Sequence, residues 1–305
     1  MMKIFNKFDF SNKDNNLLYF ILFIFLLLGI FFSTENNRLN NEYIRQENKF
    51  LEIQKILDGV LIEAEAVSVY DVTISRKIYS KNDETKMPIA SIAKIMTVVS
   101  ALNNSKSSDL VSITLDAIRQ EGDYQFFVYE KFNIIDLAKF TLIGSSNDGA
   151  YAFAENKTNF LEKINEKAKK IGMDNTLFFN FTGLDINETT PGVFSSASDV
   201  NIMAIYASKA YPEVFSKSIL PEISIKSKNG FNHNIKNTNI ILDKIPNILF
   251  SKTGFTELAK GNLVIIYKNK HGHDIAITVL GSSIDGRFTD MEKIIDVLYN
   301  LDYGN

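Results

Sequence analysis

Two side chains in the segment PIASIAKIMT could act together as a nucleophile and its base. Ser91 and Lys94 lie three residues apart at the head of a helix that the apolar spacing predicts over 91–102, so both occupy one face. A serine hydroxyl becomes an effective nucleophile when a base removes its proton, and a lysine can be that base when burial and nearby cations lower its pKa. The apolar neighbours Ile92 and Met96 could keep Lys94 dry. The alternative is that Ser91 merely caps the helix while Lys94 is solvated.

The segment GSSNDGA supplies a second hydroxyl together with an amide. Ser145 and Asn147 fall in a predicted loop between two helices, where such a pair can relay a proton and hold a substrate carbonyl. The same Ser-x-Asn pattern occurs at 80–82 and 227–229, where it is typical of a surface turn. Only the copy at Ser145 lies between predicted helices and is followed by small residues that permit close packing.

The segment SKTGFT combines a cation, a hydroxyl and a bare backbone within a predicted strand over 248–256. Lys252, Thr253 and Gly254 are consecutive there. A glycine inside a strand is expected where another backbone or a ligand approaches closely. Such a strand edge can bind an extended peptide and grip its carboxylate. The alternative is an exposed Lys-Thr pair at the end of an edge strand.

Composition excludes several other kinds of chemistry. The 305 residues are 45% apolar, which indicates a globular protein, and the formal net charge of −3 gives no reason to expect a nucleic-acid partner. The absence of cysteine excludes disulfides, iron–sulfur clusters, thiolate zinc sites and a cysteine nucleophile. With three histidines in the whole chain, His233, His271 and His273, we expect no metal and no other cofactor.

The elements that would position these residues form a mixed pattern of strands and helices. Strands at both ends of the folded region, with helices between them, predict an α/β fold of the α+β type, an antiparallel sheet flanked by helices. A hairpin is expected over 64–79, turning around Asp71. Further strands are expected at 248–256, 262–267 and 275–280. Further helices are expected at 134–142, 160–171, 199–207 and 289–301.

The N-terminal part of the chain carries an uncharged apolar run over 17–32, preceded by three lysines. At 1.5 Å per residue the run is slightly short for a bilayer core of about 30 Å, but it is long for the apolar h-region of a cleavable signal peptide, which has roughly 7–15 residues. We predict a short cytoplasmic segment (1–16), a transmembrane signal anchor (17–32), a solvated and partly helical tether (33–55) and a folded domain (56–303). This arrangement implies a single-pass protein of the cell membrane with its folded domain outside the cytoplasm. The alternative is a cleaved signal peptide and a secreted protein.

The three chemical segments, in this order, resemble those of the penicillin-recognising serine acyltransferases. FTGLD at 181–185, SSASDVNIMA at 195–204 and KTGFTELAKGNLV at 252–264 narrow the resemblance to the low-molecular-mass penicillin-binding proteins. These are serine-type D-alanyl-D-alanine carboxypeptidases. The resemblance implies a β-lactamase/DD-peptidase-like fold with an all-helical subdomain, covering the chain from about residue 65 to the closing helix.

The resemblance also implies catalytic roles. Ser91 matches the acylated nucleophile of the family and Lys94 matches its base. Ser145 and Asn147 match the second motif, and Lys252 matches the cation of the third.

Four further residues match the substrate-binding side of the family's site. Thr253 and Gly254 match the strand that binds the substrate carboxylate, and Arg287 aligns with an arginine that helps to hold it. The oxyanion hole would consist of the backbone N–H groups of Ser91 and Phe255. Phe255 stands where many relatives carry histidine, which keeps the backbone donor and changes the side chain beside the acyl group.

The implied activity is removal of the terminal D-alanine from peptidoglycan stem peptides through an acyl-enzyme on Ser91. β-Lactams would acylate the same serine, and the N-terminal helix would bind the membrane. One alternative is a class A-like β-lactamase, which deacylates with a glutamate beyond the second motif; the corresponding segment LFFNFTGLD has none. Another is a non-catalytic penicillin-binding sensor.

Overall fold

The chain divides into two compact units, Met1–Glu52 and Ile53–Asn305. The computed structural model describes residues 12–300 apart from 104, 123 and 156. The predicted cytoplasmic segment and the end of the predicted closing helix therefore lie partly outside the described residues. In its described part the first unit is helical throughout and belongs to α1 (Asn12–Asp58).

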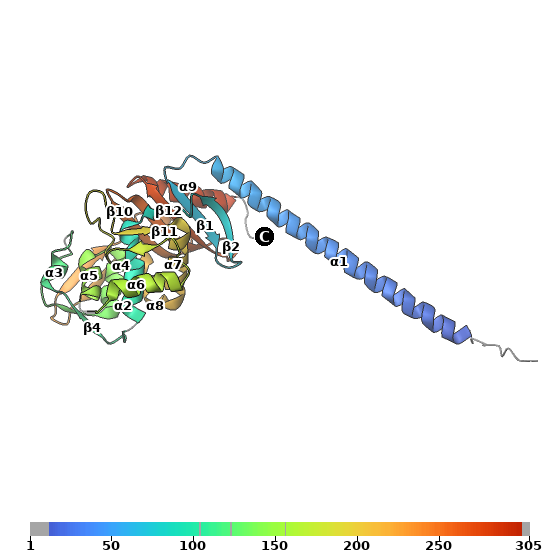
Figure 1. Ribbon diagram of the computed structural model, residues 1–305, viewed down its shortest axis with the longest axis horizontal. Coiled ribbons are helices and arrows are strands. Elements are labelled where there is room, and N and C mark those ends of the chain that lie inside the picture. The colour runs from blue at the N-terminus through green and yellow to red at the C-terminus, as the bar shows by residue number, and fades with distance from the viewer. Residues whose placement is uncertain (1–11, 104, 123, 156, 301–305) are drawn as a thin grey trace, which may run out of the picture. The chain divides into compact units, whose positions relative to one another are not determined.

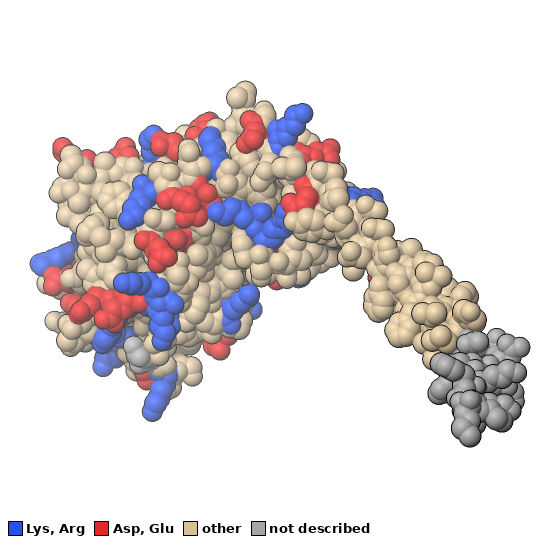
Figure 2. Space-filling model, turned by 45° about the vertical axis from the view of Figure 1, so that its right-hand side comes forward, with Lys and Arg blue, Asp and Glu red and all other residues tan. Residues whose placement is uncertain are grey.

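Helix α1 continues through the predicted tether. No glycine or proline occurs between Gly29 and Gly59, so nothing in this stretch interrupts the helical hydrogen bonds. The apolar part of α1 is long and apolar enough to cross a membrane, and none of its most apolar stretch is buried. Figure 2 shows this stretch, next to the grey atoms, as a surface without charged side chains, whereas cationic and anionic side chains are interspersed on the second unit.

The second unit is built on a five-stranded antiparallel sheet with the strand order β10-β11-β12-β1-β2. Its strands are β1 (Ala66–Asp71), β2 (Arg76–Lys81), β10 (Ile248–Thr256), β11 (Lys260–Lys268) and β12 (Asp274–Ser282). The predicted hairpin turns just after Asp71, whose Oδ1 accepts hydrogen bonds from the N–H groups of Thr73 and Ile74. Pairing of β1 with β12 joins the two ends of this unit, as Figure 1 shows.

Helices pack against this sheet because both of its faces are apolar. On β12, Ala276 and Leu280 belong to the main core, whereas Ile275 and Ile277 are equally buried on the other face. Helix α7 (Ala197–Ala210) contacts β1, β11 and β12, and α9 (Gly286–Asn300) contacts β11 and β12.

A mainly helical region forms the remainder of the second unit, around α2 (Lys94–Asn103). Residues 94–102 of α2 are all buried, because α4, α5, α6 and α7 surround it. The other helices of this region are α3 (Leu115–Ile118), α4 (Ile134–Ile143), α5 (Asn147–Ala154), α6 (Phe160–Lys170) and α8 (Pro212–Phe215). Single 3₁₀ turns lie at η1 (Ala90–Ala93), η2 (Ser216–Ile219) and η3 (Leu242–Lys244).

Three small sheets complete the unit. The first has the order β3-β7-β6, and the other two are two-stranded. Their strands are β3 (Met87–Pro88), β6 (Leu177–Phe178), β7 (Val193–Ser195), β4 (Leu110–Ser112), β5 (Lys131–Asn133), β8 (Glu222–Lys226) and β9 (Asn232–Lys236).

The predicted fold class is confirmed, and the predicted helices and strands of the second unit are present with shifts of a few residues at their ends. The structure adds α5 and the hairpin of β8 and β9, which the sequence patterns did not indicate. Helix α5 has only eight residues and each strand of the hairpin only five, so their apolar patterns are short.

Candidate active site

Ser91 lies in the 3₁₀ turn η1 rather than in an α-helix. The prediction that the α-helix begins at Ser91 is wrong, since α2 begins at Lys94. In a 3₁₀ turn, side chains three residues apart eclipse one another and therefore point to the same side of the turn. The Nζ atom of Lys94 accordingly lies 2.6 Å from Oγ of Ser91. The turn therefore places the amine of Lys94 within hydrogen-bond distance of the hydroxyl of Ser91.

The amine of Lys94 is fully buried, with an exposed fraction of 0%. It also donates a hydrogen bond to the backbone oxygen of Thr182 at 2.6 Å. Burial lowers the pKa of Lys94 well below its ordinary value, and the positive charge of Lys252 lowers it further, against a smaller opposing effect of Glu121. The site therefore favours the neutral amine, which can accept a proton.

A second lysine approaches the site from β10. Nζ of Lys252 donates to Oγ of Ser145 at 2.9 Å and to the backbone oxygen of Thr253 at 2.8 Å. Burial, followed by the charge of Arg287, lowers the pKa of Lys252 from 10.5 to about 7. Ser145 adopts a left-handed backbone conformation, with φ of 60°, in the short link between α4 and α5. This link brings its hydroxyl to the β10 lysine.

Asn147 occupies the first position of α5, so the prediction that it lies in a loop is wrong. Ser146 caps that helix by accepting a hydrogen bond from the N–H of Gly149 at 3.0 Å. The amide of Asn147 donates to the backbone oxygen of Glu121 at 2.6 Å. Its Oδ1 is buried and has no hydrogen-bond partner among the described residues. In the described part of the chain this oxygen is thus an unpaired buried acceptor.

Strand β10 passes very close to η1 at Gly254. A Cβ atom on Gly254 would lie 2.6 Å from the backbone oxygen of Ile89, so only glycine allows this approach. Thr253 is buried, and its Oγ1 lies 2.5 Å from Oγ1 of Thr238. The next side chain, Phe255, is 39% exposed. The end of the strand thus reaches the surface beside Ser91.

Arg287 belongs to the same cluster. This side chain comes from the first turn of α9, is 8% exposed, and donates from Nη1 to the backbone oxygen of Gly254 at 2.8 Å. Its Nε is buried without a hydrogen-bond partner among the described residues. The guanidinium therefore holds β10 through this hydrogen bond and adds positive charge next to Lys252.

One segment of this cluster has no signal in the pattern of residue types and was indicated only by the resemblance of FTGLD. Gly183 has φ of +81°, and a Cβ atom there would lie 2.0 Å from the backbone oxygen of Ala90. The loop that contains Gly183 therefore packs tightly against η1, the turn that carries Ser91. Asp185 fixes the loop to the end of β10 by accepting hydrogen bonds from Thr256 and from the N–H of Leu258.

The structure thus brings together Ser91 with Lys94, and Ser145 with Lys252, while Gly254 touches both η1 and Arg287. Asn147 starts α5, two residues after Ser145. Among the described residues, no group of three or more acidic or histidine side chains could hold a metal ion.

The chain is similar to curated peptidases. It is 29% identical to D-alanyl-D-alanine carboxypeptidase DacF of Bacillus subtilis, over 78% of this chain and 62% of that protein. It is 30% identical to a D-alanyl-D-alanine endopeptidase of Pseudomonas aeruginosa, over 65% of this chain and 64% of that protein. The chain therefore spans less than two thirds of the length of these two relatives.

Two solved structures share the fold. The ampicillin-bound penicillin-binding protein D2 of Listeria monocytogenes is 26% identical, with a TM-score of 0.65, and the match covers 78% of this chain and 98% of that one. A variant of the Streptomyces K15 DD-transpeptidase is 25% identical, with a TM-score of 0.70, and the match covers 79% and 99%. The peptidase S11 family profile, described as D-alanyl-D-alanine carboxypeptidase, matches residues 54–283. The chain therefore belongs to the peptidase S11 family of D-alanyl-D-alanine carboxypeptidases.

Proposed function

We propose that this protein is a serine D-alanyl-D-alanine carboxypeptidase that removes the terminal D-alanine from peptidoglycan stem peptides. The observation that carries the proposal is the buried Lys94 amine, with its lowered pKa, 2.6 Å from the hydroxyl of Ser91. A neutral amine at this distance can take the hydroxyl proton as the oxygen attacks.

The proposed reaction begins with attack of Oγ of Ser91 on the carbonyl carbon of the penultimate D-alanine. Lys94 accepts the hydroxyl proton, and the negative oxygen that develops accepts hydrogen bonds from the N–H groups of Ser91 and Phe255. One such donor is typically worth about 3–4 kcal/mol in the transition state. The scissile C–N bond then breaks, a proton passes to the leaving amine, and free D-alanine departs.

The second serine is suited to carry that proton. The hydroxyl of Ser145 lies 2.9 Å from the amine of Lys252, whose pKa of about 7 lets it exchange protons near neutrality. In its charged form Lys252, with Thr253, would bind the terminal carboxylate of the peptide, and Arg287 would add positive charge nearby. Water then hydrolyses the ester on Ser91 and restores the enzyme.

A class A-like β-lactamase is the second candidate, because it would use the same serine and lysine. That reaction needs a carboxylate to activate the water that releases the penicillin product. The only carboxylate in the segment 177–185 is Asp185, and it is engaged by Thr256 and the N–H of Leu258. This arrangement favours the peptidase, so we expect bound penicillin to be released slowly. Rapid turnover of penicillin would favour the β-lactamase instead.

Labelling of the full chain with a fluorescent penicillin tests the nucleophile and base. We expect Ser91→Ala and Lys94→Met to abolish the label, the latter because methionine keeps the volume and removes the base. Lys209→Met, on an exposed position of α7, serves as the matched control and should label normally. Retention of the label in Lys94→Met would refute the assignment of the base.

Release of D-alanine from a D-Ala-D-Ala peptide separates an enzyme from a sensor. We expect release that disappears in Ser91→Ala. A chain that binds penicillin and releases no D-alanine would be the non-catalytic penicillin-binding sensor.

We also propose that the apolar run at 17–32 is an uncleaved anchor and that the second unit works outside the cytoplasm. The length and composition of α1 support this location, as does the position of the substrate in the cell wall. Protease added to intact cells should digest the second unit, and N-terminal sequencing should recover the uncleaved anchor. A mature protein that begins after residue 32 would show that the segment is a signal peptide.

A further inference from the structure

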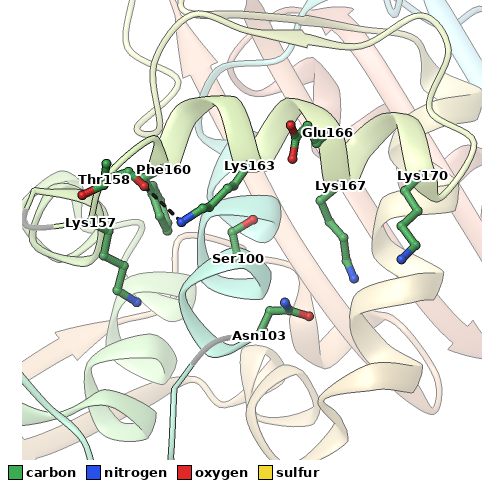
Figure 3. A pocket seen from close by; sticks show the side chains of 9 residues that line it. All are labelled: Ser100, Asn103, Lys157, Thr158, Phe160, Lys163, Glu166, Lys167 and Lys170. Carbon is green, nitrogen blue, oxygen red and sulfur yellow. Dashed lines mark hydrogen bonds between the residues drawn. The ribbon is translucent and has the colours of Figure 1, made fainter.

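A cationic pocket lies between α6 and α2. The pocket has a volume of about 630 Å³ and is separate from the residues assigned to catalysis. Figure 3 shows its lining: lysines from α6 and the segment before it on one side, Ser100 and Asn103 of α2 on the other. Its ionisable residues are one glutamate, Glu166, and four lysines, Lys157, Lys163, Lys167 and Lys170.

The four lysines of the lining outnumber its single carboxylate, Glu166. Among the described residues, none of the four forms an ion pair with a carboxylate; Lys163 donates to the backbone oxygen of Thr158, and Lys167 lies over the ring of Tyr206. Lys157 donates to the backbone oxygen of Ala101 at 3.1 Å. A nearby carboxylate usually stabilises the ammonium group of a lysine. Four lysines around one cavity, without such a partner in the described part of the chain, therefore give it excess positive charge.

Lys157 responds to the neighbouring positive charge. Burial lowers the pKa of Lys157, the charge of Asp109 opposes this effect, and the charge of Lys163 adds to the lowering. The two ammonium groups therefore repel each other, and a bound anion would relieve that repulsion.

A polar group on the opposite wall also lacks a partner. Ser100 is 7% exposed, and its Oγ is buried without a hydrogen-bond partner among the described residues. A hydroxyl at such a place can donate to an anionic oxygen while the surrounding ammonium groups balance the charge. The pocket thus combines the two features that an anion with several oxygens requires.

We propose that this pocket binds a phosphoryl group, through Ser100 of α2 and the lysines of α6. A tetrahedral phosphate presents oxygens in several directions at once, which suits donors that come from two helices. The volume leaves room for a substituent, so a phosphate ester or a pyrophosphate fits better than a lone carboxylate. This site is independent of the proposed peptidase activity.

Calorimetric titration of the full chain in neutral detergent tests the site with two probes. Pyrophosphate in solution represents a free phosphate, and phosphatidylglycerol added to the micelles represents a lipid headgroup. Removing one charge-assisted hydrogen bond should weaken binding about tenfold in Lys163→Gln, and Ser100→Ala should weaken it about fivefold. The probe that binds in this pattern identifies the source of the phosphoryl group.

Lys169→Gln is the matched control, because Lys169 lies on the same helix, is exposed and does not line the pocket. It should leave binding unchanged, and all three variants should still be labelled by penicillin, which shows that they fold. The proposal is overturned if neither probe binds, or if Lys169→Gln weakens binding as much as Lys163→Gln. The latter result would indicate general attraction to a basic surface.

Discussion

Replacing Lys252 by methionine should make the stability of the second unit less dependent on pH. Methionine is similar in length and apolar, so it removes the buried amine without opening a large cavity. In the folded protein the pKa of Lys252 is lowered from 10.5 to about 7, because the amine is buried and faces Arg287. In the unfolded chain its pKa returns to the ordinary value.

Proton linkage gives the sign and the size of the pH dependence that Lys252 adds to the stability. Between about pH 7 and pH 10.5 the unfolded state binds more protons at this position than the folded state, so stability rises with pH there and falls as pH decreases. With these two pKa values, the wild type should gain about 3 kcal/mol between pH 6 and pH 9 from Lys252 alone. The substitution also removes the charge that lowers the pKa of Lys94, which changes the comparison in the same direction.

Urea unfolding of the full chain in detergent, measured for both proteins at these two pH values, tests the reasoning. Near-ultraviolet circular dichroism is a suitable probe because the chain has 12 tyrosines and no tryptophan. The unfolding free energy of the variant minus that of the wild type should fall by about 3 kcal/mol from pH 6 to pH 9, because the titrations that both proteins share cancel in this difference. A difference that stays constant would mean that Lys252 keeps an ordinary pKa, and the proton exchange proposed for it would be refuted.

Three further outcomes are expected. Gly254→Val should slow penicillin labelling by more than about tenfold, because its Cβ would lie 2.6 Å from the backbone oxygen of Ile89; unchanged labelling would contradict that close approach. The labelling rate should rise with pH along a limb that lies well below the ordinary lysine range, because burial lowers the pKa of Lys94; a rate that rises only near pH 10.5 would show a charged amine. Asp185→Ala should lower the free energy of unfolding by about 2 kcal/mol, because two hydrogen bonds at the end of β10 are lost. An unchanged free energy in urea unfolding would contradict this role of Asp185.

The sequence determined the residue types of the site, their order along the chain and the class of fold. The apolar period of α2 and the continuous buried runs of β11 and β12 come from burial of neighbouring residues, which leaves a mark on consecutive positions of the sequence. The three chemical segments could likewise be recognised because each is short and contiguous. The roles of their residues rest on resemblance, and labelling of the variants will test them.

Only the tertiary structure decided how these segments meet. The hydroxyl of Ser91 meets Lys94 through a 3₁₀ turn, and that turn is held by Gly183 and Gly254, which are far away in the sequence. The low pKa of Lys94 likewise depends on burial by four helices and on the charge of Lys252. Contacts between such distant residues follow from packing the whole unit, and packing leaves no period in the sequence from which they could be read.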